Sequence, residues 1–330
     1  MIKRKCLTQL ALSALLTAGV AADATAAIQR TFVASYGIDA GSCGITSPCR
    51  TFGFAMAQTL SNGEIIVLDS AGYGAPVTIA QSVSIIAPPG VYAGISVFSG
   101  VGITISAGSG KVTLRGLTIN QLGGTTGIQV NSANTVYIDR VTISGFANGL
   151  VVSTAAPTTI NILQSVFRDN TGSGATFTNS AGTLAVSIEG SVFERHNGSA
   201  ASFANNTAGA IVSSLIAGGG SGIVLNPTSG TSKIEVRDSN INDNTSNGVF
   251  AAGTGAGTAT ASVVSSIVSG NGNGLLAQGA GNQIYVSDST ITRNTTGVVT
   301  LSSGTVVSGT DNRLVNNNTN GAFSSTVGKI

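Results

Sequence analysis

Ile234-Glu235-Val236-Arg237-Asp238-Ser239-Asn240-Ile241, which leads to Asn244, is the stretch that decides the fold. Apolar and polar residues alternate along it, and this alternation is the pattern of a β-strand with one buried face. Asn tolerates the left-handed backbone of a sharp turn, so Asn244 indicates a turn after the apolar residues. The stretch therefore predicts a short half-buried strand structure that ends in a tight turn.

The same pattern recurs along the chain with a period near 24 residues. Nine copies are recognisable, and their starts are separated by 24, 24, 26, 24, 24, 27, 23 and 23 residues. A further apolar residue recurs seven positions into each copy, so the copies keep a common register. The copies open at Val112, Val136, Ile160, Val186, Ala210, Ile234, Ala261, Ile284 and Val307, and their later apolar residues are Ile119, Ile143, Phe167, Phe193, Ala217, Ile241, Val268, Ile291 and Leu314.

Two polar positions also recur in register. Stacked amides and short hydroxyls can hydrogen-bond along a stack of coils, so both positions can be buried without losing their partners. Ten residues into the copies lie Asn170, His196, Gly220, Asn244, Asn271, Asn294 and Asn317. Five residues into the copies lie Ser165, Ser191, Ser239, Ser266 and Ser289.

The repeat predicts an all-β solenoid. A unit of about 24 residues cannot bury its own apolar face, so it must stack on a copy of itself with parallel strands. We expect about 10 to 12 such coils. Only 8% of the residues are charged, against about 25% in ordinary domains. Like charges repel when they stack about 4.8 Å apart, so sparse charge is what this architecture requires.

The composition also excludes several classes of protein. With 42% hydrophobic residues the chain is unlike a disordered segment, and its 45 glycines and many β-branched residues disfavour a helical bundle. The chain has 15 basic and 13 acidic residues, so the two charges nearly balance and no dense basic surface is available for a nucleic acid. Nucleic-acid partners are therefore not expected.

The V-x-I-x-D-S-x-I-x-x-N pattern of residues 234–244 resembles the coil of the right-handed parallel β-helix proteins, the architecture of the pectate lyases. The resemblance covers roughly residues 60–323. It implies a right-handed solenoid whose N-terminal end is covered by a short amphipathic helix, and Arg50–Gln58 is the best helical segment for that role. It implies no single activity, because this architecture carries lyases, hydrolases, epimerases, adhesins and proteins without known activity.

The N-terminus predicts export. Lys3-Arg4-Lys5 precede an apolar run, and a small-residue site ends at Ala26, so residues 1–26 are interpreted as a signal peptide. Its removal would take three of the 15 basic and one of the 13 acidic residues and leave no net charge. We expect a secreted, periplasmic or cell-surface protein without a transmembrane segment in the mature chain. The remaining divisions are an N-terminal segment at 27–60, the solenoid at 61–323 and a tail at 324–330.

Cys43 and Cys49 are the two cysteines that remain after the leader. Five turn-prone residues separate them, and an even pair in an oxidising compartment predicts a local disulfide.

One group of ionisable residues lies on neighbouring predicted coils. Arg168 and Asp169 belong to one coil, and Glu194, Arg195 and His196 to the next. Asp169, Glu194, Arg195 and His196 could supply an acid, a base and a carboxylate clamp, so they are the candidate catalytic residues. The structural interpretation is favoured, because Arg168 would stack on Glu194 and Asp169 on Arg195 as an ion-pair ladder.

Asp238, Asp288 and Asp311 share another column, with Ser265 between the first two. Only Asp288 and Asp311 are on neighbouring coils, whereas calcium takes six to eight oxygen ligands. No cofactor is expected, and calcium at Asp288 and Asp311 is kept as the alternative.

Two functions follow as hypotheses. The first is an exported, non-catalytic solenoid with a surface-binding, adhesive or structural role, whose partner is an extracellular glycan or a cell-surface component. The alternative is a polysaccharide lyase or hydrolase of the pectate-lyase type that acts on acidic glycans. The chain has no Trp and five Tyr. Tyr137 and Tyr285 are predicted to face outward six coils apart, too far to form one platform for a sugar chain.

Overall fold

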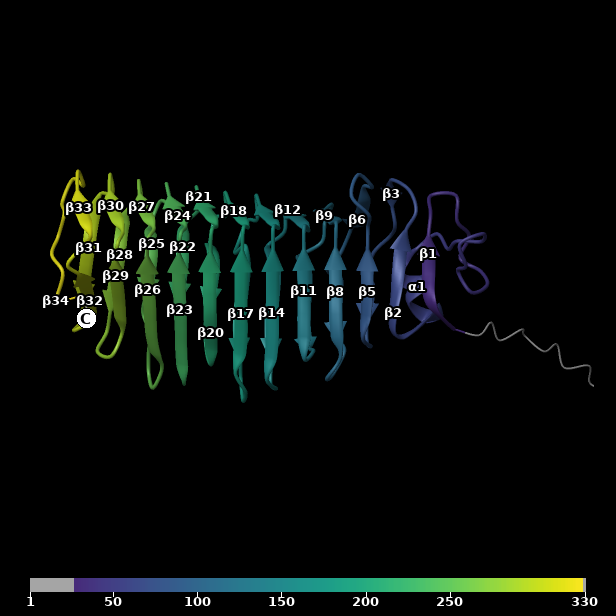
Figure 1. Cartoon of the computed structure of the whole chain (residues 1–330), viewed down its shortest axis with the longest axis horizontal. Coiled ribbons are helices and arrows are strands. Elements are labelled where there is room, and N and C mark those ends of the chain that lie inside the picture. The colour runs from purple at the N-terminus through teal and green to yellow at the C-terminus, as the bar shows by residue number, and fades with distance from the viewer. Residues whose placement is uncertain (1–26, 329–330) are drawn as a thin grey trace, which may run out of the picture.

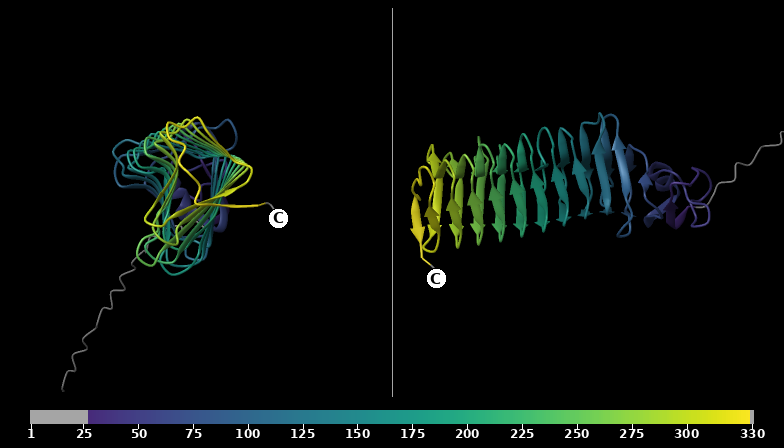
Figure 2. Two further views of the ribbon diagram at one scale, coloured as in Figure 1. Left: turned by 90° about the vertical axis from the view of Figure 1, so that its left-hand side faces the viewer. Right: turned by 90° about the horizontal axis from the view of Figure 1, so that it is seen from above.

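The computed structural model describes residues 27–328. The chain winds into about 11 coils that stack along one axis, and each coil contributes a strand to each of three parallel sheets, here called sheets A, B and C. Figure 1 shows the strands of sheet A side by side along the molecule, and the end-on view of Figure 2 shows the coils one behind another. The all-β parallel solenoid predicted from the repeat is confirmed.

Sheet A has 13 strands. In spatial order they are β1 (Ile28–Val33), β2 (Thr59–Val67), β5 (Val83–Ile86), β8 (Lys111–Arg115), β11 (Thr135–Asp139), β14 (Thr158–Leu163), β17 (Leu184–Glu189), β20 (Thr207–Val212), β23 (Thr231–Arg237), β26 (Thr258–Val264), β29 (Gln283–Ser287), β32 (Thr305–Gly309) and β34 (Ser325–Val327).

Sheet B has 11 strands, most of them three residues long. They are β3 (Ala71–Gly72), β6 (Ala93–Val97), β9 (Leu117–Gln121), β12 (Thr142–Ser144), β15 (Val166–Arg168), β18 (Val192–Glu194), β21 (Leu215–Ala217), β24 (Asn240–Asn242), β27 (Ile267–Ser269), β30 (Thr290–Thr292) and β33 (Arg313–Val315).

Sheet C has 10 strands. They are β4 (Val77–Ile79), β7 (Val101–Ser106), β10 (Thr126–Ser132), β13 (Asn148–Thr154), β16 (Ala175–Asn179), β19 (Ser199–Phe203), β22 (Ser221–Leu225), β25 (Asn247–Ala251), β28 (Asn273–Gln278) and β31 (Thr296–Leu301).

The core lies inside the coils and is built from the alternating apolar residues. Ile234 and Val236 of β23 are buried, and Ile241 of β24 is buried on the next side of the same coil. Identical aromatic residues also stack between coils inside the solenoid. The rings of Phe167 and Phe193 lie 4.6 Å apart and nearly parallel. The period-two pattern of the sequence thus becomes a continuous apolar column along the axis.

The register of two coils differs from the sequence alignment by one residue. Val186 pairs with Gly209 rather than with Ala210, and Ile284 pairs with Val306 rather than with Val307. The alignment followed apolar side chains and passed over Gly209, whereas the backbone ladder decides the pairing. A Cβ on Gly209 would lie 1.8 Å from the carbonyl oxygen of Val186, so a side chain has no room there.

The same shift moves two predicted columns. Ile216, not Ala217, stacks on Phe193 in sheet B. Gly219, not Gly220, takes the turn position of the asparagine column, because its N–H donates to Oδ1 of Asn244 at 3.1 Å.

A serine ladder stabilises the turns between sheets A and B. The N–H of Ser239 donates to Oγ of Ser266 in the next coil at 3.1 Å, and the Ser239 hydroxyl donates to the Arg237 carbonyl at 2.8 Å. Both polar atoms of each serine are therefore satisfied away from water. The predicted column is confirmed and also contains Ser214, which the one-residue shift had hidden. Its members are Ser165, Ser191, Ser214, Ser239, Ser266 and Ser289.

An asparagine ladder stabilises the turns between sheets B and C. The N–H and the Nδ2 of Asn244 both donate to Oδ1 of Asn271, at 3.1 and 2.9 Å. The pattern repeats from Asn271 to Asn294 and from Asn294 to Asn317. The residue before each ladder position has a positive φ, for example 57° at Asp243, which explains the tight turn.

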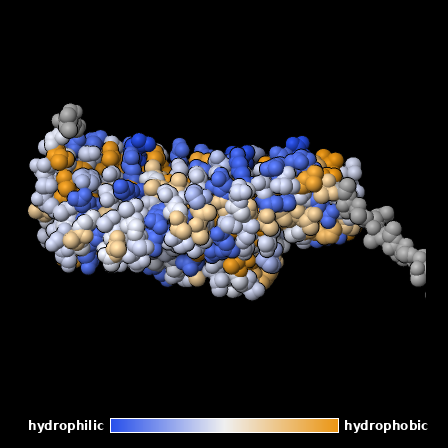
Figure 3. All heavy atoms as spheres, turned by 90° about the horizontal axis from the view of Figure 1, so that it is seen from below, coloured by the Kyte–Doolittle hydropathy of each residue, from blue (hydrophilic) through white to orange (hydrophobic). Residues whose placement is uncertain are grey.

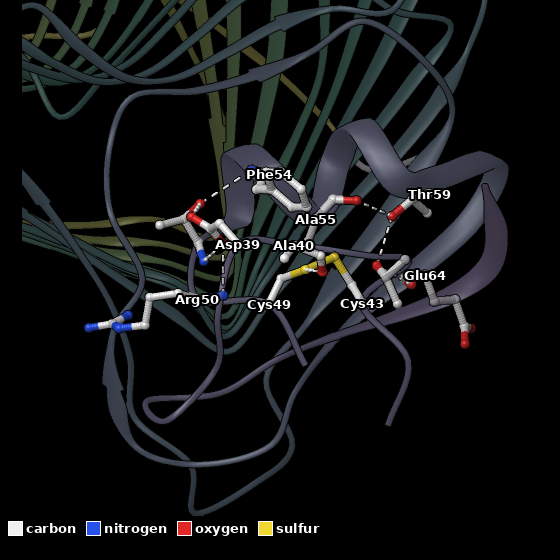
Figure 4. The surroundings of a disulfide bond; sticks show 11 residues. Asp39, Ala40, Cys43, Cys49, Arg50, Phe54, Ala55, Thr59 and Glu64 are labelled. Carbon is white, nitrogen blue, oxygen red and sulfur yellow. Dashed lines mark hydrogen bonds between the residues drawn. A yellow bond between two sulfur atoms is a disulfide. The ribbon is translucent and has the colours of Figure 1, made fainter. Parts of the chain in front are cut away.

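The disulfide between Cys43 and Cys49 closes a loop against the N-terminal edge of sheet A (Figure 4). The N–H of Phe32 in β1 donates to the Cys43 carbonyl, and the N–H of Ala34 donates to the Cys49 carbonyl, at 2.8 and 2.9 Å. The loop therefore pairs with the outer edge of β1, which would otherwise be open to another strand.

The predicted N-terminal helix is α1 (Phe52–Gln58), at the N-terminal end of the coils (Figure 1). Thr51 caps it by accepting a hydrogen bond from the Phe54 N–H at 3.2 Å, and Asp39 accepts from the N–H groups of Arg50 and Thr51. Three residues of the helix are buried against the end of the coils: Phe52, Ala55 and Met56.

Two strands lie outside the range 61–323 assigned to the solenoid. β1 belongs to the N-terminal segment, and β34 lies in the stretch described as a tail, where it pairs with β32. The predicted signal peptide, residues 1–26, lies outside the described residues. Across residues 27–328, no helix is long and apolar enough to cross a membrane.

Candidate functional site

The ionisable residues of the two neighbouring coils that contain β15 and β18 form the predicted ladder on the surface. β15 and β18 place Arg168 beside Glu194. Asp169 accepts from Nε of Arg195 at 2.7 Å, and Nη2 of Arg195 lies 2.8 Å from Oε1 of Glu194. Hydrogen bonding by Arg195 lowers the pKa of Asp169, and the same contacts raise the pKa of Arg195. Both groups therefore stay charged and paired near neutral pH.

His196 does not face this surface. It takes an asparagine position in the turn ladder, and its Nδ1 lies 3.4 Å from Nδ2 of Asn170. Only 2% of the residue is exposed, and burial lowers its pKa to about 4 against smaller opposite effects of Asp169 and the Phe167 carbonyl. Its Nε2 is buried without a hydrogen-bond partner. The imidazole is thus neutral at pH 7 and packed inside the solenoid.

The acidic column is arranged as the register predicts. The N–H of Asp288 donates to Oδ1 of Asp311 at 2.9 Å, and Ser265 donates to Oδ2 of Asp288 at 2.9 Å. Asp238 lies beyond Ser265. Between residues 27 and 328, no three His, Cys, Asp or Glu side chains gather as metal ligands. Two neighbouring carboxylates supply at most four oxygens, so calcium at Asp288 and Asp311 stays a prediction.

A groove that the sequence analysis did not identify follows the corner between sheets A and B. One cavity of about 350 Å³ is lined by Asp139, Arg140, Leu163, Gln164, Glu189, Gly190 and Ser213. A second, of about 160 Å³, is lined by Ala87, Pro88, Pro89, Gly90, Val91, Gly116 and Arg140. Arg140 borders both cavities. The two cavities therefore lie next to one another, and their lining residues come from successive coils. We call this surface the corner groove.

Asp139 anchors the basic residues of the corner groove. It ends β11 and is 9% exposed. Nε of Arg115 lies 2.7 Å from Asp139 Oδ2, and Nε of Arg140 lies 3.2 Å from Oδ1. Arg140 itself is in the left-handed region with φ 53°, which turns the chain from sheet A into sheet B. About half of its side chain remains exposed, so the guanidinium is held in place yet accessible.

Glu189 and Gln164 complete the polar lining. Glu189 is exposed at the end of β17 and lies two positions along the column from Asp139, with Leu163 between them. A signal for this site was present in the sequence: Arg115 and Asp139 are 24 residues apart, one coil, with opposite charges. The repeat alone could not show that their corner is hollow, because the depth of a surface depends on the neighbouring turns.

A third cavity, of about 290 Å³, lies on the outer face of sheet A near β34. Tyr285 borders it, together with Asp311 and several small or apolar residues. The other outward tyrosine, Tyr137, lies in a different environment, because Nζ of Lys111 is 4.9 Å from its ring centre. The two tyrosines thus do not form one platform. Figure 3 shows that strongly hydrophobic residues form only small separate groups on the face that it displays.

Comparisons with known proteins agree with the fold. Residues 99–262 match the family model of the right-handed β-helix region. The crystal structure of the pectate lyase Pel9A is similar, with a TM-score of 0.54 and 14% identity over 91% of this chain and 78% of that one. The crystal structure of the Dettilon tailspike protein gp208 aligns with a TM-score of 0.40 and 13% identity, over 80% of this chain and 61% of that one. No curated protein sequence matches the chain.

Proposed function

Since the chain is a parallel β-solenoid that contains a right-handed β-helix region, we propose that it binds an extended polysaccharide in the corner groove without cleaving it, as an exported surface-binding protein. The observation that supports this most is that Arg140 lines both cavities, which therefore lie next to one another along successive coils. A groove that crosses coil after coil suits a long, repetitive ligand better than a small one. The similarity to Pel9A supports the fold only.

The chemistry of the groove suits sugar hydroxyls. Arg140 is a donor, Glu189 an acceptor, and the Gln164 amide is both. Leu163 adds an apolar surface between them. Successive coils repeat about every 4.8 Å, so each coil can meet a new part of an extended chain. This combination of a few polar groups with apolar lining is typical of ligand sites.

The corner groove favours binding over catalysis. Both oxygens of its better-buried carboxylate, Asp139, are engaged in ion pairs with Arg115 and Arg140. The candidate catalytic residues Asp169, Glu194, Arg195 and His196 form none of its lining. Their arrangement as ion pairs and a buried imidazole supports a structural role.

One observation keeps the hydrolase alternative open. Asp139 and Glu189 lie two strand spacings apart in the same groove, or about 9 to 10 Å. Inverting glycosidases place their two carboxyl groups about 6.5–9.5 Å apart. A hydrolase or lyase of this type would act on the same bound polysaccharide, so one experiment distinguishes the two functions.

Export is part of the proposal. The basic and apolar leader predicts it, and the disulfide between Cys43 and Cys49 is the kind of bond that persists in an oxidising compartment.

The test uses the mature chain and a panel of immobilised polysaccharides, both acidic and neutral, with and without calcium. We expect retention on at least one polysaccharide, with no release of reducing ends or unsaturated products. Arg140→Gln should abolish this retention. Arg168→Gln is the matched control, because Arg168 is an equally exposed arginine outside the groove.

Other outcomes decide between the hypotheses. Product release that disappears in Glu189→Gln would establish the hydrolase alternative. Product release that disappears in Arg195→Ala would instead show that the ion-pair ladder around Arg195 is the catalytic site. Absence of retention on every polysaccharide, by a chain with a native circular dichroism spectrum, would refute binding.

A further inference from the structure

We infer that the cavity on the outer face of sheet A, near β34, is a second binding site, separate from the corner groove, and that it takes a neutral sugar residue. The cavity has a volume of about 290 Å³, enough for one or two sugar rings, and is lined by Ser262, Val264, Tyr285, Val286, Ser287, Val307, Gly309, Asp311, Val327 and Gly328. Below, it is called the end cavity.

Tyr285 provides a flat apolar surface in the end cavity. The residue is 39% exposed, and its hydroxyl donates to Oε1 of Gln283 at 2.9 Å, which restrains the ring. The next residue in the same outward column is Val307. Although its side chain points out of the sheet, Val307 is only 7% exposed, and it lines the bottom of the cavity beside the Tyr285 ring. Val327, at 52% exposed, borders the site from β34.

These residues match the apolar face of a pyranose ring. The C–H groups of a sugar ring pack on an aromatic face, and a tyrosine contributes this contact with little loss of side-chain freedom. The hydroxyl groups of the sugar then point outward around the ring, where they need polar partners.

Polar partners surround the ring of Tyr285. Ser262 is its neighbour in the outward column, and Ser287 lies two residues along β29. Asp311 is the charged residue among those that line the end cavity, and the Asp288 N–H holds its Oδ1 at 2.9 Å. The other carboxylate oxygen of Asp311, Oδ2, is buried. The sugar hydroxyl groups would therefore bond to Ser262 and Ser287, and Asp311 contributes its charge to the cavity.

Charge selects the class of sugar. Asp311 carries a negative charge into the cavity, and the exposed Asp288 adds a second close by, whereas no lysine or arginine is among the lining residues. The carboxylate of a uronate would be repelled by these two aspartates, and it would find no basic partner among the lining residues. The end cavity therefore selects neutral sugars. The corner groove, with Arg140, lacks this restriction.

The test follows the ring of Tyr285 directly. The chain has five tyrosines and no tryptophan, so incorporation of 3-fluorotyrosine gives a small set of ¹⁹F resonances. The resonance missing from Tyr285→Phe identifies Tyr285. The probes are neutral hexasaccharides of glucose, mannose, galactose and xylose, and a hexagalacturonate as the acidic comparison.

We expect at least one neutral hexasaccharide to shift the Tyr285 resonance, and hexagalacturonate to leave it unchanged. Tyr285→Ala should weaken that binding about tenfold or more, which is the loss of one well-packed contact. Tyr137→Ala is the matched control and should have no effect, because Tyr137 is an outward tyrosine of the same sheet. Asp311→Asn keeps the acceptor for Asp288 and should let hexagalacturonate shift Tyr285.

The inference is overturned if no neutral probe shifts the Tyr285 resonance, or if hexagalacturonate binds there as tightly as the neutral probes. It is also overturned if Tyr285→Ala and Tyr137→Ala bind alike. The result is independent of the corner groove: Arg140→Gln should abolish retention by the groove and leave the shift of Tyr285 intact.

Discussion

Gly174 lies directly against His196 of the next coil: a Cβ atom added to Gly174 would stand 2.6 Å from Nε2 of the imidazole. The same contact recurs with asparagine. A Cβ on Gly149 would stand 3.1 Å from Nδ2 of Asn170, and a Cβ on Gly248 would stand 3.0 Å from Nδ2 of Asn271. In all three cases a backbone carbonyl oxygen of the next strand lies closer still, at 2.5 to 2.6 Å. These strands of sheet C therefore carry a glycine because the backbone and the ladder side chain of the following coil together occupy the space of a Cβ.

Ala200, which replaces the glycine in β19, obeys the same relationship. Ala200 takes the glycine position in β19, and the ladder residue of the following coil is Gly219, which has no side chain. The glycine position of sheet C can thus hold a side chain where the ladder position of the following coil holds none. The residue types at these two positions therefore depend on one another.

Gly174→Ala should lower the free energy of unfolding by about 1–3 kcal/mol, because the methyl group overlaps both the Ala200 carbonyl oxygen and the His196 ring. Adding His196→Gly should recover the part of this loss that comes from the imidazole, since the pair would then have the same residue types as Ala200 and Gly219, whereas the overlap with the Ala200 carbonyl oxygen remains. The coupling is measured by urea unfolding of the two single variants and the double variant. Strictly additive effects would show that the two residues are not in contact.

The stability should fall as the pH drops from about 6.5 to about 4. The folded protein holds the pKa of His196 near 4, whereas the unfolded chain protonates it near 6.5. The unfolded state therefore binds more protons in this window, and the contribution lost by pH 4 is roughly 3 kcal/mol at most. Unfolding in urea at pH 7.5 and pH 4.5 measures it.

His196→Asn is the control for the pH effect. It restores the residue found at this position in neighbouring coils and fits beside Gly174, as Asn170 fits beside Gly149. The variant should lose the pH dependence between 6.5 and 4. An unchanged pH profile would show that His196 is not the group responsible in this window. Asp169 and Asp69 are not the alternative, because their pKa values are lowered and they act at still lower pH.

Ser239→Ala should cost about 1–3 kcal/mol of stability, because the buried N–H of Ser214 loses its acceptor. Ser265→Ala is the matched control: Ser265 is the neighbouring serine of the next coil, but it is exposed and bonds only at the surface with Asp288. Its substitution should change the stability by less than about 0.5 kcal/mol. Equal effects of the two variants in thermal unfolding would contradict a role for the buried ladder.

Replacing Cys43 and Cys49 together by serine should cost about 2 kcal/mol, as expected for a short closed loop. The amides of Phe32 and Ala34 should then exchange faster with solvent, because the loop that accepts their hydrogen bonds is no longer held against β1. Hydrogen exchange measured by NMR checks this. Ile45→Ser, an exposed change in the same loop, should leave both amides protected.

Arg195→Ala should leave the thermal unfolding temperature almost unchanged, since Arg195 and its partners Asp169 and Glu194 lie at the surface and solvent screens exposed ion pairs. A loss comparable to that of Ser239→Ala would show that the ion-pair ladder supports the fold.

Much of the architecture was predictable from residues 234–244 and their copies. A solenoid is built from local units, and each residue meets its counterpart about one period away, so spacing along the chain translates into contact in space. The asparagine and serine columns, the pairing of Arg168 with Glu194 and of Asp169 with Arg195, α1 and the disulfide were all accessible in this way.

The errors arose where the side-chain pattern and the backbone pairing diverge. Gly209 occupies an inward position that an apolar residue fills in other coils, so the alignment shifted by one residue and lost Ser214, Ile216 and Gly219 from their columns. β34 was also missed, because a strand that pairs only with β32 has no full repeat of its own.

By itself, therefore, the sequence determined that this chain is a parallel β-solenoid and which residues stack, because periodic burial and pairing between neighbouring coils are encoded in the spacing of residues. Only the tertiary structure decided where the surface is hollow. The corner groove around Arg140 and the end cavity beside Tyr285 depend on how far each turn projects and on where β34 lies. How far a turn projects depends on residues that do not repeat from coil to coil, so it cannot be inferred from the period of the sequence.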